Sequence, residues 1–238
     1  MTYFSFHLTF ILPPIVLMGA TLPRAECLRG SRARLAIPLI SLVALTYTIP
    51  WDNYLVAQQI WWYGADRVLM TIGFVPIEEY LFFVLQPVLT GLFLFQYLGR
   101  WSQEPDQAGA ASAWLGFFLF LVLAAGGGLL LLLDWPPGTY MGLVLAWACP
   151  LLAGMWLYGG RTLWARRRLL AYTVGFPTLY LWVADATAIR TGIWTISSKY
   201  TLGLSISALP IEEATFFLMT NMLVIKGILL LLHEPDDY

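Results

Sequence analysis

Long apolar runs alternate with short polar segments along the whole of this 238-residue chain. A helix rises ~1.5 Å per residue, so ~20 apolar residues cross the ~30 Å hydrocarbon core of a bilayer. Runs of this length predict seven spans, over residues 3–21, 35–54, 76–98, 113–133, 139–158, 169–187 and 209–232. The second and sixth runs grade into aromatic and polar residues. The pattern predicts an all-α integral membrane protein with seven transmembrane helices.

Composition supports a bilayer environment. Hydrophobic residues make up 59% of the chain and charged residues 11%, and the mean hydropathy is +0.72. A soluble domain carries about 25% charged residues. We therefore expect the lipid bilayer to surround the protein, and we expect no nucleic acid partner.

Basic residues predict the orientation in the membrane. The loops on one side carry nine of them, and the loops on the other side carry three. The larger set is Arg24, Arg29, Arg32, Arg34, Arg100, Arg161, Arg166, Arg167 and Arg168; the smaller set is Arg67, Arg190 and Lys199. The more basic side is expected in the cytoplasm. This predicts a multi-pass protein of the cell membrane with its N-terminus outside and its C-terminus in the cytoplasm. The first run lacks a basic flank before it, so we expect a retained helix.

The most informative motif occurs twice. Pro76-Ile77-Glu78-Glu79 is followed by two phenylalanines, and the same pattern recurs 134 residues later from Pro210. Each copy opens an apolar helix. Ionisable residues at membrane depth are expensive to bury, so they are functional candidates by default.

The repeat extends beyond this motif. Asp52 and Trp61 recur as Asp185 and Trp194 at an offset of 133, and Tyr3 recurs as Tyr140 at an offset of 137. The span over 113–133 has no counterpart. We predict a 3+1+3 parallel internal repeat about a pseudo-two-fold axis along the membrane normal. Residues 1–98 form the first three-helix repeat, 99–138 a linker and connecting helix, and 139–238 the second three-helix repeat.

Helix geometry predicts that six carboxyl groups share one layer near the outer interface. Asp52 lies 17 residues into its span, roughly 25 Å from the cytoplasmic side, and Asp185 has nearly the same depth. The glutamates begin helices that return from the outer side. The candidate catalytic residues are Glu78, Glu79, Glu212, Glu213, Asp52 and Asp185. The alternative is that the glutamates only stabilise helix N-termini, where acidic residues are favoured.

Aromatic and amide side chains surround this layer. Glu79, Phe83 and Gln86 share one helix face, as do Glu213, Phe217 and Thr220. The candidate substrate-binding residues are Trp51, Trp61, Phe82, Phe83, Gln86, Trp194, Phe216, Phe217, Thr220 and Asn221. The alternative for some of the aromatic residues is that they anchor the helices at the interface.

Missing motifs narrow the chemistry. The chain has two histidines, far apart in sequence, which excludes a histidine-rich di-iron site. It has no G-x-G-x-x-G after a strand and no P-loop. We therefore expect neither a metal nor a cofactor. What remains is a set of carboxylic acids, which can stay protonated in an apolar layer, beside aromatic faces that stabilise a cation. This combination suits proton-initiated carbocation chemistry on an apolar polyene.

These residues resemble a known family. Pro-Trp-Asp-Asn-Tyr at 50–54, Ile60-Trp61 and the doubled Pro-Ile-Glu-Glu helices are similar to the small membrane-embedded lycopene cyclases, and the chain resembles their fused form. The resemblance implies a lycopene beta-cyclase of carotenoid biosynthesis. Such an intramolecular lyase closes the linear ψ ends of lycopene into β-ionone rings, through γ-carotene, without net redox change or cofactor. Thr220 stands where the first half has Gln86, so the halves differ and the acid and base remain open, as does the number of rings closed.

Two other functions fit parts of the pattern. A 3+1+3 repeat also occurs in transporters of small solutes, although here the carboxylates are confined to one end. A retinal protein would use a lysine in its seventh span, and Lys226 lies there. It lies about 24 Å from Pro210 along the helix, so we expect its side chain to extend to the cytoplasmic interface.

Overall fold

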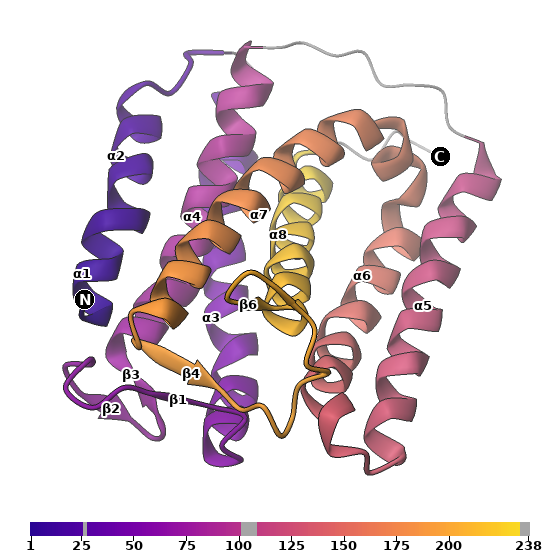
Figure 1. Ribbon diagram of the computed structural model, residues 1–238. Helices are drawn as coiled ribbons and strands as arrows, with labels where there is room; N and C mark the ends of the chain where they lie inside the picture. Colours follow the sequence, from indigo (N-terminus) through magenta and orange to yellow (C-terminus); the bar gives the residue numbers. More distant parts are fainter. Residues whose placement is uncertain (26–27, 101–108, 234–238) are drawn as a thin grey trace.

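Eight α-helices form a bundle in the computed structural model, which describes residues 1–25, 28–100 and 109–233 (Figure 1). A one-turn helix, a π-helix over His7–Ile11 and α2 together form the first long helix. The α-helices are α1 (Tyr3–Phe6), α2 (Leu12–Ala20), α3 (Ser31–Ala57), α4 (Ile77–Arg100), α5 (Ala110–Leu132), α6 (Thr139–Ala165), α7 (Arg167–Arg190) and α8 (Ile211–Leu232). Prolines lie inside four of the long helices, which is tolerated where neighbouring helices surround the backbone.

Six of the described helical segments are long and apolar enough to cross a membrane, judged by length and composition. They correspond to six of the seven predicted spans. The remaining predicted span, residues 169–187, falls within α7, which is 24 residues long but does not meet the same hydropathy criterion. Asp185 within it lowers its hydropathy. The coarse prediction of a helical, multi-pass membrane protein therefore agrees with the structure.

Short strands, which the apolar pattern does not reveal, gather at one end of the bundle (Figure 1). Each strand pair is antiparallel: β1 (Trp61–Tyr63) with β4 (Trp194–Ile196), β2 (Thr71–Ile72) with β3 (Val75–Pro76), and β5 (Ser205–Ile206) with β6 (Leu209–Pro210). Two-residue loops close the two hairpins. Gly73 begins one of these loops with a φ of +66°, a conformation that glycine adopts without strain. The hairpins lead directly into α4 and α8.

The directions of the helices place the ends of both halves at the strands. Figure 1 shows that α3 and α7 run toward the strands, whereas α4 and α8 start there and run away. The central helix α8 packs against α3, α4, α6 and α7, and α5 packs along α6 at the edge of the bundle. Gly116 of α5 permits this close approach, because the Trp156 ring lies directly against it.

The prediction for Lys226 is wrong. Its side chain is 4% exposed and does not extend to the interface. The Nζ atom lies 4.3 Å from the ring centre of Phe120 and 5.3 Å from that of Trp156. Aromatic faces of α5 and α6 thus supply a local cation–π site. Helix length alone could not show that aromatic rings enclose the ammonium group.

Candidate active site

A cavity at the strand end of the bundle brings together four carboxyl groups. It is lined by Asp52 of α3, Glu79 of α4, Asp185 of α7 and Glu213 of α8. Asp52 interacts electrostatically with Glu79 and Glu213, and Asp185 with Glu213 and Glu79. Four helices from distant parts of the sequence thus place their acidic residues around one space, as the depth argument anticipated.

Tyrosines hold the two cavity-facing glutamates. The Tyr3 hydroxyl donates to Glu79 Oε2 at 2.7 Å, and the Tyr140 hydroxyl donates to Glu213 Oε1 at 2.7 Å. Tyr63 of β1 makes a second donation to Glu79 Oε2 at 3.1 Å. Burial, and then the neighbouring Glu79 carboxyl, raise the pKa of Tyr63 well above its usual value, so Tyr63 remains an O–H donor.

The sequence did not identify these tyrosines as site residues. Tyr3 and Tyr140 did recur in the internal repeat, and this is the signal from which their role can be read. Nothing in the local sequence showed that the start of α1 and the start of α6 reach the glutamates of α4 and α8.

The other two glutamates have different surroundings. Glu78 Oε1 accepts a hydrogen bond from the Leu69 backbone N–H at 2.8 Å, and Glu212 Oε1 accepts one from the Leu202 N–H at 2.7 Å. Both side chains are buried, and neither lines the cavity. Each therefore fixes the loop that precedes its own helix. In addition, His7 Nε2 lies 2.8 Å from the Glu78 carbonyl oxygen, to which it donates.

The two aspartates differ in their hydrogen bonds. The Trp194 indole Nε1–H donates to Asp185 Oδ1 at 3.0 Å. Asp52 has no corresponding bond in the described residues, although both aspartates are 1% exposed. Among those residues, the Oδ2 atom of each aspartate lacks a hydrogen-bond partner. Buried polar atoms are normally satisfied, so these oxygens are candidates for contact with a proton or a bound molecule.

Aromatic rings form the rest of the cavity wall. It is lined by Trp61, Trp194, Phe82, Phe83, Phe216 and Phe217. The sequence selected these residues as substrate-binding candidates, and that role stays a prediction. Phe82 and Phe217 meet edge to face with ring centres 6.1 Å apart, and Phe216 meets Phe217 at 5.4 Å. Trp51 stands behind this wall and does not line the cavity, because its ring stacks on Phe216 at 5.6 Å.

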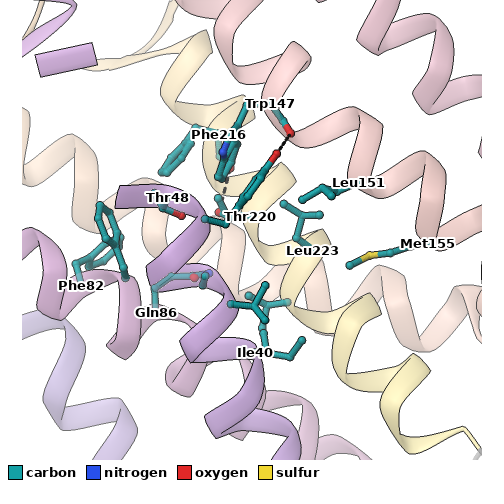
Figure 2. Close-up of a pocket in the computed structure, with 15 residues that line it drawn as sticks. Ile40, Thr48, Phe82, Gln86, Trp147, Leu151, Met155, Phe216, Thr220 and Leu223 are labelled. Atoms are coloured by element: carbon teal, nitrogen blue, oxygen red, sulfur yellow. Dashed lines mark hydrogen bonds between the residues drawn. The ribbon is translucent and has the colours of Figure 1, made fainter. Parts of the chain in front are cut away.

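An apolar groove lies beside the cavity, among the membrane-spanning helices (Figure 2). Phe82, Phe83 and Phe216 line both spaces. Gln86 and Thr220, which occupy equivalent positions in the two halves but differ in side chain, face the groove. The cavity and the groove are therefore neighbouring spaces that share three aromatic side chains.

Asn221, another substrate-binding candidate, lines neither space. It is fully buried, and its Oδ1 accepts from Gln86 Nε2 at 2.6 Å and from Thr90 Oγ1 at 2.7 Å. Its Nδ2 donates to Thr178 Oγ1 at 3.0 Å. These bonds tie α4, α7 and α8 together and orient Gln86, so Asn221 supports the groove from behind.

No group of three or more His, Cys, Asp or Glu side chains in the described ranges is arranged to hold a metal ion. The side chains of the cavity instead provide carboxyl groups, phenol and indole donors, and aromatic faces. This set can transfer protons and stabilise positive charge.

Comparison with known proteins identifies relatives of the whole chain. The family model described as lycopene cyclase matches residues 1–98 and 137–231. A lycopene beta-cyclase of Halobacterium salinarum is 41% identical over 230 residues, which cover 96% of this chain and 95% of that protein.

Fungal relatives are longer proteins. A bifunctional lycopene cyclase/phytoene synthase of Gibberella fujikuroi is 35% identical over 246 residues, covering 95% of this chain and 39% of that protein. One of Blakeslea trispora is 30% identical over 233 residues, covering 94% of this chain and 38% of that protein. No solved structure gives a significant match.

Proposed function

This chain belongs to the lycopene cyclase family, and we propose that it is a lycopene beta-cyclase that closes ψ ends of lycopene into β-ionone rings. The observation that carries the proposal is the meeting of four buried carboxyl groups in one aromatic cavity that lies beside an apolar groove. The cavity offers proton transfer and cation stabilisation, and the groove suits the polyene. Lycopene and the γ-carotene intermediate would both be lipid-dissolved substrates.

The reaction needs an acid and a base close together. A proton added to carbon 2 of the ψ end leaves a tertiary cation at carbon 1. The 5,6 double bond attacks carbon 1, which closes the ring and moves the charge to carbon 5. Loss of the proton on carbon 6 then forms the β ring, so one proton enters, one leaves and oxidation state is unchanged. Carbons 2 and 6 both neighbour carbon 1 in the ring, so one compact set of carboxyl groups can serve both steps.

Hydrogen bonding distinguishes the four carboxyl groups. Glu79 accepts two phenol O–H donors, which stabilise a carboxylate, so we assign it as the base. Asp52 interacts with Glu79 and accepts no hydrogen bond from the described residues, so we assign it as the acid. Glu213 and Asp185 complete the polar wall. Glu78 and Glu212 position the loops before α4 and α8.

The aromatic wall has a separate part in this mechanism. The rings of Phe82, Phe216 and Phe217 surround the cavity on the side of the groove. Aromatic faces stabilise a positive charge that has lost its water shell, and their bulk excludes water that would otherwise capture the cation. Neither the family nor the named relatives favour transport of a small solute, and the carboxyl groups lie at one end of the bundle.

Hydrogen bonds across the halves support the proposed 3+1+3 parallel repeat. In the β1–β4 ladder Trp61 pairs with Ile196, Trp62 with Thr195, and Tyr63 with Trp194. At the repeat offset of 133, Trp62 and Thr195 are equivalent positions. The same offset relates the pair Trp61–Ile196 to the pair Trp194–Tyr63. A two-fold axis generates this reciprocal pattern. The Gly64 N–H bond to Ile193 O and the Ser197 N–H bond to Ile60 O, both 2.9 Å, repeat it.

The first prediction is conversion of lycopene without added cofactors. Cells that accumulate lycopene should form γ-carotene or β-carotene, resolved by chromatography, when this chain is expressed. Purified protein in detergent should do the same with a chelator present and without flavin or nicotinamide, since the reaction conserves oxidation state. Unchanged lycopene in both settings, at normal protein abundance, would contradict the function; an absolute need for reduced flavin would contradict the cofactor prediction.

The second prediction concerns orientation. The described basic residues support it, because Arg32, Arg100 and Arg167 lie at helix ends opposite the strands. We propose that this end faces the cytoplasm and that the acidic cavity lies near the outer face of the cell membrane. A reporter that is active only in the cytoplasm, fused after the C-terminal residue, should be active. The same reporter at the N-terminus should be inactive, and the reverse result would contradict the orientation.

A further inference from the structure

The groove beyond the cavity lies between three helices. Its lining comes from α3, α6 and α8, with Phe82, Phe83 and Gln86 contributed by α4. Figure 2 shows Leu151 and Met155 on one wall, facing Leu223 and Thr220. Between α3 and α6, the Tyr47 hydroxyl bonds to the Trp147 carbonyl, and the rings of Tyr47 and Trp51 both stack on the Trp147 ring.

Three polar side chains of the groove donate hydrogen bonds within the protein. The Tyr47 hydroxyl donates to the Trp147 carbonyl at 2.9 Å. Thr220 Oγ1 donates to the Phe216 carbonyl at 3.0 Å, and Gln86 Nε2 is bound to Asn221. Since these donors already have partners and most of the other lining side chains are apolar, the groove presents a mainly apolar surface. A hydrocarbon chain loses no hydrogen bonds on entering it, whereas a polar ligand would.

The groove opens sideways at the depth of the membrane. Val43 and Tyr47 of α3 and Leu151 of α6 line it, and they are 50%, 37% and 39% exposed. Val43 lies 12 residues after the start of α3 at Ser31, roughly 18 Å along the helix. At this depth the outside is hydrocarbon rather than water. A lipid-dissolved molecule can therefore reach the groove from within the bilayer.

The repeat shows that the groove is one-sided. The Tyr180 hydroxyl donates to the Phe10 carbonyl at 2.7 Å, the counterpart of the Tyr47 bond to Trp147. Ala44 and Thr48, which line the groove, correspond at the offset of 133 to Pro177 and Leu181, both buried and bulkier. The two sides thus keep the same polar contact but differ in the side chains behind it.

We propose that the groove between α3, α6 and α8 is the binding site for the polyene chain of the substrate, which enters sideways from the bilayer between α3 and α6. This inference rests on the proposed function. The position of the groove identifies the occupant, because it shares Phe82, Phe83 and Phe216 with the cavity that holds the carboxyl groups. The ψ end lies among the carboxyl groups while the conjugated chain lies along α8. One end of the molecule is closed in each binding event.

The test blocks the far end of the groove. Met155 lies on α6 eight residues beyond Trp147, roughly 12 Å from the cavity end. Met155→Trp should lower kcat/KM for lycopene at least about tenfold, since a misfit of a single methylene in an apolar pocket already costs about 10-fold or more. The matched control is Leu157→Trp on the same helix, because Leu157 is exposed and lines no part of the groove.

A second substrate separates blockage from general damage. The second substrate is an acyclic apocarotenal that keeps one ψ end but has a shortened chain. Met155→Trp should lower the activity on this substrate less than the activity on lycopene. Leu157→Trp should leave both substrates at the wild-type rate. Equal rates for the two variants on lycopene, or an equal loss on both substrates with Met155→Trp, would overturn the assignment of the groove as the binding site of the polyene chain. Wild-type protein that converts neither substrate would instead contradict the proposed function.

Discussion

Glu79→Gln is expected to lower the rate of lycopene cyclisation at least ~10²-fold, the usual contribution of a general acid or base. Glutamine keeps the size of the side chain and can still accept from Tyr3, whose hydroxyl lies 2.7 Å from Glu79 Oε2. It cannot take up the proton from carbon 6. The measurement is the initial rate of ring formation in membranes, normalised to the amount of folded protein.

The neighbouring glutamate provides the matched control. Glu78→Gln should lose less activity, since the amide oxygen of glutamine can still accept from the Leu69 N–H. If both glutamates only stabilised the start of α4, each change would alter stability by about 0.3–1 kcal/mol and leave turnover nearly intact. Near-normal turnover with Glu79→Gln would therefore show that Glu79 is not the base.

Asp52→Asn is the second change for which we expect a loss of at least ~10²-fold. The amide has almost the same shape as the carboxyl group but has no acidic proton to give to carbon 2. Thermal stability should be unchanged or higher, because the change removes a buried carboxyl group whose Oδ2 has no partner in the described structure. Loss of turnover with retained stability is the signature that distinguishes a catalytic role from a structural one.

Two further aspartates test this assignment. Asp185→Asn, the equivalent change in the second half, should cause a smaller loss, because Trp194 already occupies one oxygen of Asp185. Asp66→Asn should have no effect, since Asp66 is an exposed turn residue with a φ of 58°, which asparagine also adopts. If Asp185→Asn were the more harmful of the two cavity changes, the acid would belong to the second half.

Local sequence pattern was sufficient for the helices and for the layer of carboxyl groups. Apolar length predicted six helices that are long and apolar enough to cross a membrane, and of the six carboxyl groups predicted to share one layer, the structure brings Glu79, Glu213, Asp52 and Asp185 together. The pattern could not separate Glu78 from Glu79. Adjacent residues on a helix point in directions about 100° apart, and which direction meets the cavity depends on how the bundle packs.

Other parts of the site depend on contacts between distant segments. Tyr3 is 76 residues from Glu79 in sequence, and Tyr140 is 73 residues from Glu213. From sequence alone, tyrosines near a membrane boundary are interpreted as interfacial anchors. The groove was equally invisible, because an apolar residue such as Met155 has the same pattern whether it faces lipid, a neighbouring helix or a substrate. Only the internal repeat carried information about these long-range contacts.

The reciprocal ladder between β1 and β4 has a consequence for half-length chains. Each strand pairs with its own equivalent, so the surface that joins the halves is close to self-complementary. A polypeptide containing three helices and one such strand would therefore be able to dimerise with its own copy and enclose two sets of Asp, Glu and Tyr. A symmetric homodimer is thus a physically reasonable ancestor of this chain. Gene duplication and fusion would then have allowed one half to lose proton-transfer capacity while the other kept it. Ile196, at the position equivalent to the donor Tyr63, has the form of such a loss.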